Sequence, residues 1–285
     1  MDWSDWAVWL LLAALIVNVV LYFRIMRKNR RLHALADESN RLRHAAEATE
    51  QRNRQLKQEM TSNIAHELKT PVASIRGYLE ILLGPHAVDE QQRRHYLERC
   101  LTQTLRLSEL IQDVSLINKL EESASLFPCS EVDVRHVLQE VCDEFASAAA
   151  ERSVRLHNDL PPMPLVGNAE LLYRLFRNLV ENAVSYAGSD IDVVVEPYSP
   201  QSLLPAGRYY YIHFYDTGCG VPEEYLSRLF DRFVRIGEGR SRREGGTGLG
   251  LSIVKHAVQF HRGEIYVQGR PEGGLEFFFS LKCDS

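Results

Sequence analysis

The stretch from residue 61 to residue 83 limits what this chain can fold into more than any other. Its large apolar residues recur at spacings of three and four, which is the period of one face of an α-helix. These residues are Ile64, Leu68, Val72, Ile75, Leu79 and Leu82. At about 100° per residue, His66 points away from this stripe, toward solvent or a partner. Glu67 is its neighbour, and Thr70 lies one turn further on the same face.

An imidazole, a carboxylate and a hydroxyl on one exposed helix surface indicate a reactive site. The alternative is an ordinary solvated surface, since the chain contains ten histidines and a His-Glu pair on a helix is usually only solvated. The residues further along the chain favour the reactive site.

A second helix is expected after Gly84-Pro85, with Asp89 as its N-cap and an end near residue 120. Its apolar positions are Leu97, Leu101, Leu107, Ile111, Val114 and Ile117. Two such helices form a hairpin that buries its apolar stripes poorly when it is alone. We therefore expect two hairpins, from two copies of the chain, to pack as a four-helix bundle.

The N-terminal part predicts a membrane anchor. Residues 6–23 are uncharged and largely apolar, close to the about 20 residues that span a bilayer as a helix. Basic residues follow at once, so the positive-inside rule places residues 1–5 outside and the rest of the chain in the cytoplasm. A signal peptide and a buried core helix are the alternatives. The basic n-region that a signal peptide requires is absent from residues 1–5.

Residues 24–60 are expected to form a signalling helix. A heptad can be laid over residues 32–63 without a charged residue at a core position, which favours a parallel coiled coil with Asn53 in its seam. A solvated single helix is the alternative. The five cysteines are scattered and fit a reducing compartment. The net charge of −5 gives no indication of a nucleic-acid partner.

The sequence from about residue 128 to the end predicts an α+β layer domain. Helices are expected at 132–150, at 170–187 and from about 248, and strands at 153–157, 191–196, 209–215, 264–268 and 275–281. The order lacks a regular alternation of strand and helix. This excludes a doubly wound parallel sheet.

Several clusters in this domain suit a nucleotide and its metal. Asn178, Asn182 and Tyr186 share one face of a helix, and amide oxygens are ligands that suit Mg²⁺. Asp216 ends an aromatic strand and is followed by two glycines, so it could accept a hydrogen bond from an exocyclic amine. The glycine-rich run 245–250 precedes a helix, where phosphates commonly bind.

The segment between the two glycine clusters is too long for a simple connection and is expected to be a lid over the nucleotide. Its arginines could reach a polyphosphate. They are Arg232, Arg235, Arg240, Arg242 and Arg243. Taken singly, each cluster has an ordinary explanation as a surface, a turn or a hinge. Their combination after the His66 hairpin is specific.

In this combination the chain resembles the membrane-bound sensor histidine kinases of two-component signalling, with a HisKA-type hairpin and a GHKL-type ATPase domain. The resemblance covers about residue 60 to the end. Its motifs are the H-box at 62–71, the N-box at 178–183, the G1 box at 216–220, the F-box at 229–233 and the G2 box at 246–251. It implies a transmembrane helix (6–23), a signalling coiled coil (24–60), a dimerising hairpin (61–122) and an α+β ATP-binding sandwich (128–285).

The resemblance also implies roles for residues. His66 is phosphorylated from Mg-ATP, Glu67 assists its imidazole, and Thr70 helps to orient water when a partner is dephosphorylated. The implied nucleotide site consists of Asn178, Asn182, Tyr186, Asp216, Gly218, Gly220, Gly246, Thr247, Gly248, Leu249 and Gly250, with Asn182 on Mg²⁺. The implied partners are a second copy and the receiver domain of a separate response regulator, at the bacterial inner membrane.

Two positions depart from the family pattern. Ser185 stands where a lysine is common, and Asn168 stands where an aspartate is common. Two other functions are therefore considered. One is a phosphatase-dominant regulator, and the other is a non-catalytic, membrane-anchored ATP-binding scaffold.

Overall fold

A computed structural model describes residues 21–22, 24, 26–28, 43, 47, 50–52, 58, 60–84, 88–122, 127–199, 209–235 and 246–283. Most of the expected membrane segment, except residues 21 and 22, and most of the expected coiled-coil seam lie outside these residues. Within the described ranges, no helix is both long enough and apolar enough to cross a bilayer. The chain divides into two compact units, 1–62 and 63–285. The second unit carries the candidate site.

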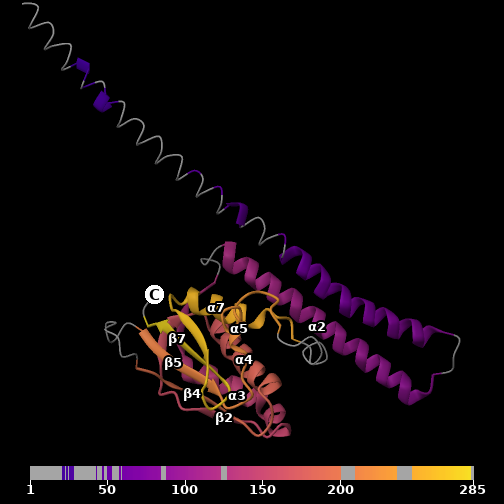
Figure 1. Ribbon diagram of the computed structural model, residues 1–285. Coiled ribbons are helices and arrows are strands. Elements are labelled where there is room, and N and C mark those ends of the chain that lie inside the picture. The colour runs from indigo at the N-terminus through magenta and orange to yellow at the C-terminus, as the bar shows by residue number, and fades with distance from the viewer. Residues whose placement is uncertain are drawn as a thin grey trace, which may run out of the picture. The chain divides into compact units, whose positions relative to one another are not determined.

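The predicted hairpin is confirmed (Figure 1). Residues 60–83 are helical, and α2 spans Glu90–Glu122. Asp89 caps α2 as predicted, because its Oδ1 accepts a 2.7 Å hydrogen bond from the backbone N–H of Gln92. Tyr78 stacks on Tyr96 across the hairpin, with ring centroids 5.7 Å apart. The two arms therefore lie side by side along their outer halves.

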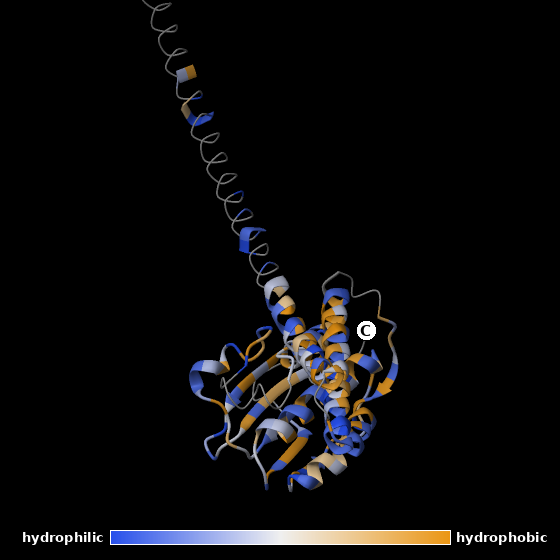
Figure 2. Ribbon diagram, turned by 90° about the vertical axis from the view of Figure 1, so that its right-hand side faces the viewer, coloured by the Kyte–Doolittle hydropathy of each residue, from blue (hydrophilic) through white to orange (hydrophobic). Residues whose placement is uncertain are grey.

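Much of the apolar surface predicted to be buried is exposed on a single hairpin. Val72 in the first arm is 51% exposed, and Leu97 and Leu101 in α2 are 50% and 60% exposed. Apolar residues occur as bands along these helices (Figure 2). A groove of about 360 Å³ opens on the first arm and is lined by Val72, Ile75, Arg76, Leu79, Glu80 and Leu83. The single chain leaves a continuous apolar surface available for a partner.

The predicted α+β domain is also confirmed. Its five-stranded sheet has the order β2-β4-β5-β7-β6 and is antiparallel except between β2 and β4. The strands are β2 (Arg155–Asn158), β4 (Asp192–Pro197), β5 (Tyr209–Asp216), β6 (Ile265–Gly269) and β7 (Leu275–Lys282). The helices are α3 (Val134–Glu151), α4 (Ala169–Tyr186) and α7 (Gly250–Phe260).

The core of this domain lies between the sheet and its helices. Phe176 of α4 contacts Phe279 of β7, and both are nearly inaccessible to solvent. Phe214 and Ile212 of β5 are likewise buried, while the alternate residues His213 and Tyr215 are half-buried. This alternation follows from the two-residue period of a strand. The core holds α4 against β5 and β7, and the ends of these elements form the candidate site.

Three short elements were missed by the sequence prediction. β1 (Ser130–Asp133) pairs antiparallel with β3 (Pro164–Gly167), and α5 (Glu223–Leu226) lies in the expected lid. The helix expected from residue 132 begins at Val134, because Asp133 Oδ1 accepts hydrogen bonds from Arg135 N–H and Met163 N–H. Strands of four residues carry too little periodicity to be recognised in a proline-rich stretch.

The departure at Asn168 has a structural explanation. Asn168 is buried and caps α4, since its Oδ1 accepts a 2.9 Å hydrogen bond from Leu171 N–H. Its amide donates to Pro128 O, and its backbone N–H donates to Nε2 of His261. Asparagine caps a helix about as well as aspartate does, so this position is compatible with an intact domain.

Candidate functional site

The predicted reactive residues lie together on the first arm of the hairpin. His66 is exposed, as its helical position predicted. The hydroxyl of Thr70, also exposed, donates a 3.3 Å hydrogen bond to the backbone oxygen of His66. Glu67 is partly buried, and its Oε2 lies 3.8 Å from a guanidinium nitrogen of Arg106 and 3.8 Å from one of Arg235.

Arg235 connects this surface to the glycine-rich loop. It follows the 229–233 motif and has a side chain only 18% exposed. A Cβ added to Gly248, where φ is +70°, would lie 3.4 Å from Cγ of Arg235 and 2.9 Å from Cα of Phe233. Only glycine fits this left-handed, crowded position. The loop and the carboxylate of Glu67 therefore contact the same arginine.

Arg106 makes a second connection between the hairpin and the loop. Its guanidinium donates a 3.4 Å hydrogen bond to the backbone oxygen of Gly246, while the N–H of Gly246 donates to the hydroxyl of Tyr186 at 3.1 Å. The Gly246 backbone is thus held from both sides. The predicted site residue Tyr186 lies against the glycine-rich loop.

The α4 face predicted to hold Mg²⁺ also adjoins this loop. Asn178 and Asn182 are both half-buried on α4. A Cβ added to Gly250 would lie 2.5 Å from Oδ1 of Asn178, and one added to Gly246 would lie 2.5 Å from the Tyr186 hydroxyl. The glycines thus allow the loop to approach the Asn178 amide and the Tyr186 hydroxyl closely. A hard oxygen donor beside a backbone cradle fits a phosphate-bound Mg²⁺.

Asp216 lies at the end of β5 and is buried, with 5% exposed. Its Oδ1 accepts a hydrogen bond from Gly218 N–H at 2.9 Å, and its Oδ2 accepts one from Leu275 N–H at 3.3 Å. Burial raises the pKa of this carboxyl above its usual range, and the two backbone donors and Arg270 act in the opposite direction. Each oxygen retains a lone pair for a further donor.

The two predicted glycine clusters meet at the end of α4. Cys219 N–H donates a 2.9 Å hydrogen bond to the oxygen of Ala187, the residue after α4. A Cβ at Gly218 would lie 2.2 Å from the same oxygen, so only glycine allows this approach. Tyr186, one residue earlier, holds Gly246. The C-terminal end of α4 therefore contacts both the loop that follows Asp216 and the glycine-rich loop at Gly246.

Other predicted residues have separate environments. Gly220 has φ +65° and packs against Gly274. Leu249 is fully buried and donates its N–H to the Thr247 hydroxyl. The Arg232 guanidinium lies 3.2 Å from Nε2 of His256. The lid arginines Arg240, Arg242 and Arg243 lie outside the described residues.

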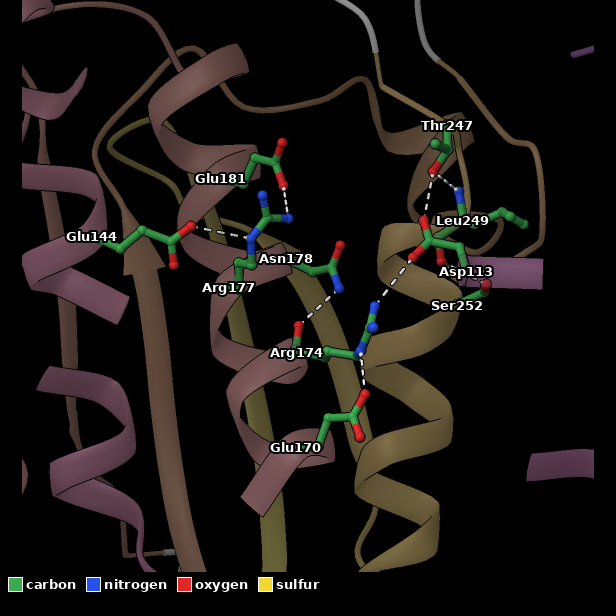
Figure 3. A network of polar contacts seen from close by, with 10 residues as sticks. All are labelled: Asp113, Glu144, Glu170, Arg174, Arg177, Asn178, Glu181, Thr247, Leu249 and Ser252. Atoms are coloured by element: carbon green, nitrogen blue, oxygen red, sulfur yellow. Dashed lines mark hydrogen bonds and ion pairs between the residues drawn. The ribbon is translucent and has the colours of Figure 1, made fainter. Parts of the chain in front are cut away.

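A polar network that the sequence analysis missed joins the hairpin to the nucleotide site (Figure 3). The Asp113 carboxylate of α2 accepts a 3.3 Å hydrogen bond from the Thr247 hydroxyl and lies 3.5 Å from Nη1 of Arg174. Arg174 also pairs with Glu170, and its backbone oxygen accepts from the side-chain amide of Asn178. One signal in the sequence could have indicated Arg174: it stands one helical turn before the predicted site residue Asn178.

Burial governs the ionisation of this network. It raises the pKa of Asp113 above its usual range, although Arg174 and the Thr247 hydroxyl act in the opposite direction. Burial also raises the pKa of Glu181, which pairs with Arg177 at 2.9 Å. These carboxylates therefore carry an energetic cost in the folded chain that their partners only partly offset.

Comparisons with known proteins agree with this arrangement. Residues 56–123 match the family described as His Kinase A (phospho-acceptor) domain. Residues 167–285 match the family described as histidine kinase-, DNA gyrase B-, and HSP90-like ATPase. The first match contains His66, Glu67 and Thr70, and the second contains Asn178, Asp216 and the rest of the candidate nucleotide site.

Individual proteins show the same relationship. The sensor-like histidine kinase SenX3 of Mycolicibacterium smegmatis is 31% identical over 226 residues, which are 79% of this chain and 57% of SenX3. The chain spans about half the length of the curated relatives it matches.

Solved structures have the same fold. Histidine kinase AdeS of Acinetobacter baumannii superposes with a TM-score of 0.61 at 20% identity, over 76% of this chain and 98% of that one. Histidine kinase ThkA, solved in complex with the response regulator protein TrrA, superposes with a TM-score of 0.59 at 20% identity, over 79% of this chain and 61% of that one.

Proposed function

The chain belongs to the sensor histidine kinases of two-component signalling, and from this premise we propose that it phosphorylates His66 from ATP and passes the phosphoryl group to an aspartate of a separate response regulator. The observation that carries the proposal is the contact of Glu67 with Arg235. It links the residue beside His66 to the glycine-rich loop of the nucleotide domain. A surface histidine without a function would have no need of this arrangement.

In the proposed reaction a ring nitrogen of His66 attacks the γ-phosphorus of ATP. The bond between that phosphorus and the oxygen bridging it to the β-phosphorus breaks, and ADP leaves. The second ring nitrogen gives its proton to the Glu67 carboxylate, so the imidazole ring of the phosphohistidine is uncharged while the phosphoryl group keeps its negative charge. Imidazole is a competent nucleophile near neutral pH, so the protein chiefly needs to position the two reactants.

Residues of the nucleotide domain supply that positioning. Asp216 would accept a hydrogen bond from the adenine amine, and the cradle at Gly246 and Gly248 would approach the phosphates. Asn182, with Asn178 beside it, would hold Mg²⁺, which neutralises phosphate charge when bound. Arg235 would place a cation between the loop and Glu67, which supports the reaction although Ser185 replaces the usual lysine.

We assign the chain's regions to this function. Residues 6–23 would anchor it in the bacterial inner membrane with residues 1–5 outside, and residues 24–60 would relay a signal as a coiled coil. Residues 61–122 would dimerise and carry His66, and residues 128–285 would bind ATP. The exposed apolar surface of the hairpin and the match to the phospho-acceptor family support a homodimer.

The test is incubation of the full chain with Mg²⁺ and ATP labelled at the γ-phosphate, beside the variant His66→Gln. We expect only the wild type to be labelled, and this label should be removed by acid but not by base. The two proteins should bind ATP with equal affinity. Label on His66→Gln would contradict the assignment of the acceptor. Bound ATP without any label on the wild type would favour the phosphatase or scaffold function instead.

A further inference from the structure

The turn between β6 and β7, residues 270–274, is held against Asp216 by one arginine. Nη1 of Arg270 donates to the backbone oxygen of Asp216 at 3.1 Å and to that of Gly273 at 3.5 Å. Its backbone N–H donates to Gly274 O, and Gly273 N–H donates to Arg270 O, both at 3.1 Å. The side chain is 17% exposed. Arg270 thus joins the turn to the end of β5.

An aromatic ring fixes the same guanidinium from another side. The Arg270 guanidinium carbon lies 4.4 Å from the ring centroid of Tyr215, a cation–π distance. Glu272 lies 3.9 Å from the guanidinium, but its side chain is 87% exposed. Such an exposed ion pair contributes little. The carbonyls and the ring, rather than Glu272, therefore determine where Arg270 lies.

The turn reaches the carboxylate of Asp216 as well as its backbone. Gly274 has φ +95°, and a Cβ there would lie 2.0 Å from Asp216 O and 2.9 Å from Oδ1. Leu275, the next residue, donates its N–H to Oδ2. A displacement of the turn would therefore move a hydrogen-bond donor of the carboxylate and open space beside it.

We propose that Arg270 is a positioning residue that makes the nucleotide site selective for adenine over guanine. This rests on the proposed function, in which Asp216 faces the nucleobase. Adenine presents an amine donor where guanine presents a carbonyl acceptor. An ionised carboxylate held in one orientation accepts from the amine and repels the carbonyl. A carboxylate free to turn or move away discriminates less well.

The electrostatic effect of Arg270 acts in the same direction. Its positive charge opposes the burial that raises the pKa of Asp216. The arginine therefore favours the ionised form, which accepts hydrogen bonds only, while the protonated form could also donate to a guanine carbonyl.

The experiment compares dissociation constants of ADP and GDP for the full chain and for Arg270→Ala. We expect the ratio of GDP to ADP dissociation constants to fall by about tenfold or more, because an oriented charged hydrogen bond is lost. Glu272→Ala, in the same turn, should leave the ratio unchanged. Arg270→Lys keeps a cation without the planar fork and should give an intermediate ratio.

The outcomes separate the two proposals. An unchanged ratio in a folded Arg270→Ala variant, or an equal loss of both affinities, would overturn the role of Arg270 in selectivity. Neither outcome would contradict the proposed function, provided that the wild type binds ADP. If Arg270→Ala does not fold, the ratio of Arg270→Lys decides, and a wild-type value would overturn the role. A wild type that binds neither nucleotide would contradict the proposed function and this inference with it.

Discussion

The hydroxyl of Thr247 donates a 3.3 Å hydrogen bond to Oδ2 of Asp113. This contact joins the glycine-rich loop of the nucleotide domain to α2 of the hairpin that carries His66. The other oxygen of Asp113 lies 3.5 Å from Arg174 on α4. One partly buried carboxylate therefore contacts two separate elements of the nucleotide domain.

Neutralising Asp113 is predicted to be tolerated, while truncating it is not. Burial disfavours the charged carboxylate more than Arg174 and Thr247 favour it, which is why its pKa is raised. Asp113→Asn should therefore preserve or increase the free energy of unfolding at pH 7. Asp113→Ala removes the acceptor and should lower it by about 1–3 kcal/mol. Urea unfolding measures both, and an equal loss in the two variants would show that the Arg174 ion pair dominates.

The stability of the folded chain should depend on pH through two partly buried carboxyls. Asp113 and Glu181 have raised pKa values, chiefly by burial, so the folded state binds their protons more readily than the unfolded state. The effect of Glu181 should be the smaller of the two, because its side chain is 41% exposed and screened by water. Their contribution is fully present below the usual carboxyl pKa of about 4 and is lost as pH rises through the raised values. Asp113→Asn and Glu181→Gln should each flatten the decline of the urea midpoint above pH 4.

An exposed carboxyl provides the control for this pH series. Glu98 pairs with Arg94 on the surface of α2, and its side chain is 63% exposed. Glu98→Gln should leave the pH dependence as in the wild type. A wild-type slope in Asp113→Asn and Glu181→Gln as well would contradict the role of these two partly buried carboxyls.

The Tyr186 hydroxyl should contribute to nucleotide affinity through the loop. It accepts the Gly246 N–H at 3.1 Å, so Tyr186→Phe removes the acceptor and frees the loop. We expect ADP affinity to fall by about two- to tenfold, the usual range for one neutral hydrogen bond. Tyr173→Phe, on the same helix with its hydroxyl bonded to Glu144 at the surface, is the matched control. If the two variants changed the ADP dissociation constant equally, the Tyr186 hydroxyl would have no specific role in nucleotide binding.

Much of this fold was predictable because its signals are local. The hairpin follows from a three-to-four residue period and a capping aspartate, and the larger strands and helices follow from similar patterns. The short pair β1–β3 was missed, since both strands lie beside prolines and are defined by their pairing with each other and not by an apolar pattern of their own.

The site was predictable only where its residues share a helix or a loop. Asn178, Asn182 and Tyr186 stand one turn apart on α4, so their common face was visible in the sequence. Asp113 and Arg270 were missed because their partners are distant along the chain: Asp113 contacts Thr247, and Arg270 contacts Asp216. Contacts of that kind depend on tertiary packing, which no local spacing encodes.

Thr70 is predicted to serve dephosphorylation of the response regulator and not the kinase step. Its hydroxyl is exposed one turn from His66, where it could orient a water molecule. Thr70→Ala should leave labelling of His66 within about twofold and slow dephosphorylation of a charged receiver domain by about tenfold or more. Ser74→Ala is the control, because the Ser74 hydroxyl makes the same kind of bond, to Thr70 O. Equal losses of both activities in Thr70→Ala would contradict this division.

The apolar face of α2 should hold the two copies of the chain together. Leu97, Leu101 and Ile111 are each at least half exposed on the single chain, although water disfavours such a surface. Leu101→Glu would place a charge in that interface and should weaken dimerisation by at least about tenfold. Sedimentation equilibrium measures this, with Glu98→Ala on the same helix as the control. A wild type that stays monomeric, or a Leu101→Glu variant that dimerises normally, would show that this face does not form the dimer.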